Sequence, residues 1–134
     1  MLDSSYSQKA CNILCPGTLR LDQNRFVGTI SSSLLTVSKD LNVLHLGNNL
    51  LAGQIPDAFD PSQPMEHLIQ FTVQHNRFSG TLPKHVGFMT RLRVLEVDNN
   101  RLTGIIPREW SYLTNLEILR LVRALLAFMK FFVC

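Results

Sequence analysis

The sequence predicts a solenoid, in which short parallel β-strands stack coil upon coil into one sheet. Three observations predict it. An asparagine recurs about every 25 residues, two apolar residues alternate before each asparagine, and a glycine and usually a proline follow it. A unit of this length cannot bury its apolar face alone, so stacked neighbours must bury it together.

Composition fits one repeat domain and excludes several function classes. The chain has 134 residues, 46% of them apolar, which is enough for one core. The formal net charge is only +3 and the basic residues are scattered singly, which argues against a nucleic-acid partner. The three cysteines, Cys11, Cys15 and Cys134, are an odd number and cannot form a closed disulfide framework.

The strands are predicted just before each asparagine. The apolar pairs that precede the asparagines by five and three residues are Leu19 and Leu21, Leu44 and Leu46, Phe71 and Val73, and Leu95 and Val97. Alternation at period two sends both members of a pair to the core and the residues between them outward. A fifth pair, Leu119 and Leu121, continues the frame.

A ladder of four asparagines is expected at the turn that ends each strand. The repeated residues are Asn24, Asn49, Asn76 and Asn100, separated by 25, 27 and 24 residues. A side-chain amide can bond backbone groups that the turn leaves unpaired, which explains a polar residue in a buried place. We therefore expect these four side chains to point inward and to be structural.

The segment after each asparagine is also repeated. A glycine follows by four residues (Gly28, Gly53, Gly80 and Gly104), and prolines close three of the four units (Pro56, Pro83 and Pro107). Glycine allows a backbone angle or a close approach that a side chain would prevent. Proline favours extended backbone and removes a donor, which suits an edge paired on one side.

The segments "LNVLHLGNNLLAGQIP" and "LRVLEVDNNRLTGIIP" resemble the plant-type leucine-rich repeat, and the resemblance covers roughly Leu19 to Leu121. It implies a right-handed β/α-type superhelix with a parallel concave sheet, irregular or 3-10 convex segments and extra short strands at Gly-x-Ile-Pro. Such domains form the ligand-sensing ectodomains of receptor-like kinases and receptor-like proteins, and the secreted polygalacturonase inhibitors. A cysteine pair caps the first coil in this family, and Cys11 and Cys15 could be its remnant.

Three segments are predicted: an N-terminal segment or cap remnant at 1–18, four full and one partial repeat at 19–126, and an apolar tail at 127–134. The frame fails in the fifth unit, where Ala124 and Phe128 replace the expected asparagine and glycine. The tail could fold over the last coil, or the chain could be a fragment or the product of a broken gene model. A truncated membrane anchor is a further alternative, although no stretch of 18 apolar residues occurs.

Ligand contacts are expected on the outward face of the concave sheet, because the residues between the core leucines point there. The candidates are Arg20, Asp22, His45, Thr72, Gln74, His75, Glu96, Asp98, Arg101 and Arg120. One flanking column aligns Arg25, Arg77 and Arg101, which could bind an acidic or carboxylate-bearing partner. Solvated surface polarity is the alternative reading of this column.

No catalytic site, metal site or cofactor is predicted. No nucleophile, base or carboxylate pair stands at motif spacing, and no phosphate-binding glycine loop occurs. His45 and His75 would share the concave face without a third ligand.

The predicted function is protein or peptide binding, as part of a receptor-like protein or receptor kinase ectodomain. The alternatives are a secreted inhibitor of a cell-wall hydrolase and an intracellular scaffold. A receptor fragment would be extracellular or at the cell surface, with any membrane link in parts outside this sequence. A chain complete as given would be cytoplasmic, because its start has no apolar signal run and it has no glycosylation sequon.

Overall fold

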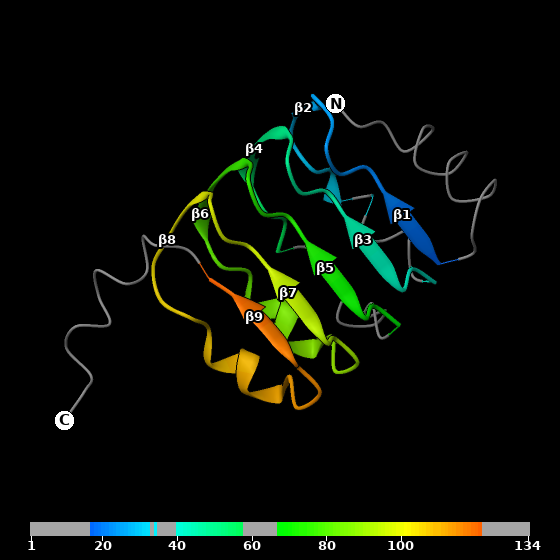
Figure 1. Ribbon diagram of the computed structural model, residues 1–134. Helices are drawn as coiled ribbons and strands as arrows, with labels where there is room; N and C mark the ends of the chain where they lie inside the picture. The colour runs from blue at the N-terminus through cyan, green and yellow to red at the C-terminus, as the bar shows by residue number, and fades with distance from the viewer. Residues whose placement is uncertain (1–16, 33, 35–39, 58–66, 122–134) are drawn as a thin grey trace.

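The computed structural model describes residues 17–32, 34, 40–57 and 67–121. Five three-residue strands form one parallel sheet in the order β1 (Thr18–Arg20), β3 (Val43–His45), β5 (Gln70–Thr72), β7 (Val94–Glu96) and β9 (Ile118–Arg120). They lie side by side in chain order, one from each coil (Figure 1). The predicted fold class, a leucine-rich repeat solenoid with a parallel concave sheet, is confirmed.

The concave strands pair column by column. Leu19, Leu44, Phe71, Leu95 and Leu119 are successive partners across the sheet. The first four are 0–3% exposed, while Leu119 is 43% exposed. The alternation in the sequence therefore specified both the buried face and the register of this sheet.

A second parallel sheet follows the asparagine turns. It contains β2 (Val27–Gly28), β4 (Leu50–Gln54), β6 (Arg77–Thr81) and β8 (Arg101–Thr103), in that order. Its register is shifted: Ala52 pairs with Arg77, and Ser79 pairs with Arg101, which is two residues out of the repeat frame at each step. One edge of every coil is thus displaced relative to the other, so the coils twist about the solenoid axis.

The convex side carries two 3-10 helices, η1 (Lys84–Phe88) and η2 (Arg108–Tyr112), directly after Pro83 and Pro107. The indole Nε1 of Trp110 donates to the carbonyl oxygen of Pro83 at 3.0 Å, and Trp110 is only 7% exposed. The prolines thus stand where extended backbone changes to helix, and Trp110 ties the two helical turns together.

Three members of the asparagine ladder bridge neighbouring coils. Asn76 Oδ1 accepts from the backbone N–H of Leu51 at 3.0 Å, and Asn76 Nδ2 donates to the carbonyls of Leu46 (2.9 Å) and Val73 (3.1 Å). Asn49 and Asn100 make the equivalent bonds one coil away on either side. Each amide therefore satisfies its own turn and also the turn of the preceding coil.

Asn24 departs from the expected buried ladder. Its side chain is exposed, and Nδ2 donates only to the carbonyls of Leu21 and Asp22 in its own turn. It belongs to the first described coil, so no described turn precedes it to accept a bond or to cover it.

The chain takes a left-handed backbone conformation immediately before each ladder asparagine. Gln23, Asn48, His75 and Asn99 have φ between 53° and 56°. The repeat pattern predicts unusual backbone angles at the glycines, and Gly53 does have φ of 81°. The pattern does not predict positive φ at the residue before each asparagine, because the residue types found there vary.

The two ends of the chain, and the extra residues of the second repeat, lie largely outside the described residues. Cys11 and Cys15, the segments 1–16 and 122–134, and residues 58–66 belong to these parts. The boundaries proposed for the three segments therefore stay predictions.

Candidate ligand-binding face

One row of side chains crosses the concave sheet. Arg20, His45, Thr72, Glu96 and Arg120 are successive partners on the five strands. They sit between the inward-pointing core residues of each strand, so they belong to the outward face. Five of the predicted contact residues are thus brought into one line by the fold.

Three members of this row have side-chain partners. Glu96 Oε1 lies 3.2 Å from Arg120 Nε, and the Glu96 side chain is 15% exposed. His45 Nε2 lies 2.9 Å from Gln70 Oε1 on the next strand. These contacts restrain the three side chains, which reduces the conformational entropy that binding would cost.

Thr72 was expected to contact the ligand, but the structure buries it. It stands in the row but is only 5% exposed. Its neighbours in register, His45 and Glu96, carry longer side chains. The short threonine side chain therefore offers little surface between them.

A second set of candidates follows the strands. Asp22, Gln74 and Asp98 occupy the same repeat position on coils one, three and four, and all three are partly buried. The coil between carries Gly47, and the side chain of Gln74 fills the space where a Cβ of Gly47 would stand. Gln74 Oε1 and Asp98 Oδ1 are buried without a partner among the described protein atoms.

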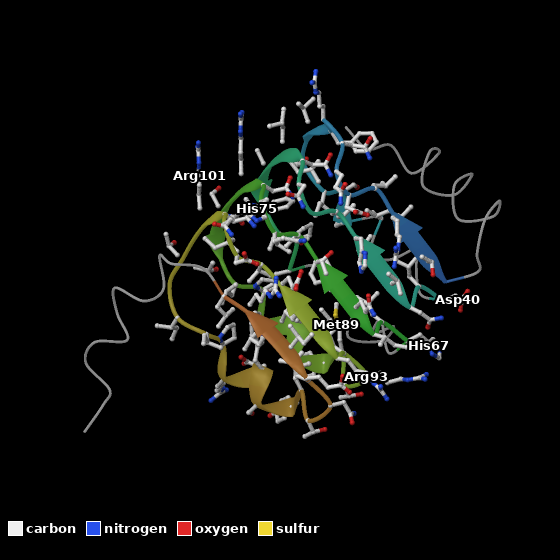
Figure 2. All side chains as sticks on the ribbon, viewed as in Figure 1. Asp40, His67, His75, Met89, Arg93 and Arg101 are labelled. Atoms are coloured by element: carbon white, nitrogen blue, oxygen red, sulfur yellow. The ribbon has the colours of Figure 1, made fainter. Side chains whose placement is uncertain are left out.

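The remaining candidates lie at the turn. Asn99 Nδ2 donates to Asp98 Oδ2 at 2.6 Å and lies 3.4 Å from His75 Nε2. His75 and Arg101 lie near one end of the concave strands, and Arg93 lies at the other end (Figure 2). Arg101 opens β8 in the second sheet, so the structure places it on the edge of the face and not within the row.

Gln70 was missed as a surface residue. It stands two positions before Thr72 on β5 and bonds His45. The period-two alternation that selected the other outward residues finds Gln70 when the strand is extended by one residue before Phe71.

The described residues contain no cluster of metal ligands and no helix that could span a membrane. No group of three or more histidine, cysteine, aspartate or glutamate side chains is placed to hold a metal ion within these ranges. Among the same residues, no helix has the length and apolar character needed to cross a membrane.

The comparisons with known proteins agree with this geometry. A family model described as Leucine Rich Repeat matches residues 40–61 and 91–113. Receptor-like protein 53 from Arabidopsis thaliana is 34% identical over 85 residues, which are 63% of this chain and 8% of that protein. The chain therefore spans a small part of the length of this relative.

Solved structures of plant receptors also superpose on this chain. The plant peptide hormone receptor RGFR1, in complex with RGF2, superposes with a TM-score of 0.73 at 35% identity, over 79% of this chain and 16% of that one. The Arabidopsis receptor kinase HAESA, in complex with the peptide hormone IDA and the co-receptor SERK1, gives 0.71 at 30% identity, over 79% and 17%. Repeat pattern, solenoid and these likenesses together show that the chain is built of leucine-rich repeats, and plant receptor ectodomains are among the structures similar to it.

Proposed function

We propose that the chain is a peptide- or protein-binding module from the ectodomain of a receptor-like protein or receptor kinase, and that its concave sheet takes the ligand. The observation that carries this proposal is the row from Arg20 to Arg120, in register across five strands. Strands stand about 4.8 Å apart, so the row is about 19 Å long, which matches roughly six residues of extended peptide.

The chemistry of the row suits a peptide. It offers two guanidinium groups, a carboxylate and an imidazole, which can bond backbone amides and charged side chains. RGFR1 and HAESA, which share this fold at 30% identity or more, were solved with peptide hormones. This likeness supports a binding role for the chain.

The same likeness favours an extracellular or cell-surface location. A receptor-like protein and receptors are among the proteins similar to this chain. The cytoplasmic location that the sequence left open has no support from them.

The test is a selection of displayed random 12-residue peptides on the purified chain, followed by calorimetric titration of the selected peptides. We expect a His45→Ala/Glu96→Ala double variant to weaken binding at least about tenfold, because both side chains sit at the centre of the row. Lys84→Ala, on the exposed convex side, should leave the affinity within about twofold. The proposal would be overturned if the selected peptides lost affinity for Lys84→Ala but kept their affinity for the His45→Ala/Glu96→Ala double variant.

A further inference from the structure

Three exposed arginines line the turn edge beside the concave sheet. Arg25, Arg77 and Arg101 each follow a ladder asparagine by one residue, on coils one, three and four. Leu50 holds the same position on coil two and is 38% exposed. We call these four residues the arginine edge.

None of the three arginines is neutralised by a salt bridge among the described residues. Arg93, Arg108 and Arg120 do pair with carboxylates, at 3.2–3.5 Å. Asp98 lies three residues before Arg101, but its Oδ2 accepts from Asn99 and its Oδ1 is buried. On the coil of Arg77, the corresponding position is the uncharged Gln74.

The spacing of the edge matches an extended chain. Arg101 pairs with Ser79, so Arg77 and Arg101 are offset by one coil and by two residues along the strand. With coils about 4.8 Å apart and a rise of about 3.3 Å per residue, their backbones are about 8 Å apart. Side chains on one face of an extended peptide repeat every 6–7 Å or so, which the flexible arginine side chains can accommodate.

We propose that the arginine edge binds an acidic, extended peptide segment of the ligand. Carboxylates at alternate peptide positions would receive the guanidinium groups of Arg25, Arg77 and Arg101, and an apolar side chain would meet Leu50. Guanidinium binds carboxylate through two parallel N–H bonds, and Arg77 and Arg101, about 8 Å apart, lie within about one Debye length of each other at physiological salt. The inference rests on the proposed function and adds the chemical class of the ligand.

The experiment measures fluorescence anisotropy of labelled peptides against the whole chain. The probe Glu-Ser-Leu-Ser-Glu-Ser-Glu, its reverse, and versions with Gln for Glu are compared at about 0.05 M and 0.15 M NaCl. We expect one acidic probe to bind at least about tenfold more tightly than its Gln version and to weaken with salt.

Two matched variants separate the edge from net charge. Arg77→Gln/Arg101→Gln should reduce affinity for the acidic probe at least about tenfold. Arg93→Gln/Arg108→Gln removes the same charge from arginines away from this edge and should change it less than about twofold. Equal losses in the two variants, or no preference for the acidic probe, would overturn the proposal.

Three further outcomes would each overturn the peptide assignment, the edge proposal or both proposals. Binding of an acidic uronate oligosaccharide, lost in Arg77→Gln/Arg101→Gln while the peptides fail to bind, would overturn the peptide assignment. If displayed peptides bind the concave row but the edge is inert, the edge proposal fails and the proposed function stands. If neither surface binds a peptide, both fail.

Discussion

The ladder asparagines act as connectors between coils at the scale of single residues. The carboxamide of Asn76 contacts two turns at once, accepting from Leu51 N–H and donating to Leu46 and Val73 carbonyls. No apolar residue could replace these bonds, since the groups concerned lie away from water.

Asn76→Ala is expected to lower the free energy of unfolding by about 1–3 kcal/mol, because it leaves buried backbone groups unpaired. Asn24→Ala is the matched control, since that side chain is exposed and bonds only its own turn. It should cost about 0.5 kcal/mol or less. Urea unfolding followed by circular dichroism measures both. Equal losses would refute the coil-bridging role of Asn76.

The residue before each asparagine is constrained by its backbone. His75 has φ of 54°, is exposed, and is not glycine. Asparagine tolerates the left-handed region well, whereas a β-branched residue there is strongly disfavoured.

His75→Asn should therefore leave the melting temperature unchanged or raise it slightly, and His75→Val should cost about 1–2 kcal/mol. Thermal unfolding of the two variants, compared with the wild type, measures both effects. A His75→Val protein as stable as the wild type would show that the turn can relax out of this conformation.

At the scale of elements, the convex side is held by close contact between η1 and η2. A Cβ added to Gly87 would meet the backbone carbonyl oxygen of Glu109, which cannot swing away as a flexible side chain could. Trp110 on η2 reaches back to Pro83, the residue before η1. The packing of the two helical turns therefore depends on the absence of a side chain at Gly87 and on the indole of Trp110.

Gly87→Ala is expected to destabilise the chain by about 1–3 kcal/mol through this overlap. Lys84→Ala, also on η1 but exposed, should change stability by no more than about 0.5 kcal/mol. The fluorescence of Trp110, the single tryptophan, reports on the packing during denaturant unfolding. An unperturbed emission spectrum and midpoint in Gly87→Ala would contradict the predicted overlap.

For the whole molecule, stability is expected to be uneven along the solenoid axis. Leu95 is fully buried between two coils, while Leu119, its partner in register on β9, is 43% exposed. Ile105 and Ile106 near the same end are 77% and 40% exposed. Repeat proteins sum coil and interface terms, so the inner coils should be the most stable.

Leu95→Ala should cost about 2–5 kcal/mol, because it opens a cavity in the packed core. Leu119→Ala should cost less than half as much, since its side chain already meets water. Denaturant unfolding gives both values, and hydrogen exchange should be faster on β9 than on β5. Comparable costs at the two positions would mean that β9 is covered as completely as β7.

The periodic features of the protein follow directly from its amino-acid sequence. Coil number, strand positions, core columns and inward amides all follow from residue types that recur at a fixed interval, because each coil meets the same neighbours as the last. Asn49, Asn76 and Asn100 were identified in this way, and so was the row containing His45 and Glu96.

Features that depend on a particular neighbouring side chain become visible only in the folded solenoid. The fold buries Thr72 between longer side chains, exposes Asn24 in the first described coil, and places Arg101 on the turn edge and not in the row. It also sets the two-residue shift of the second sheet and pairs Glu96 with Arg120. A repeat pattern specifies the average coil, whereas exposure and pairing depend on which side chains the adjacent coils present.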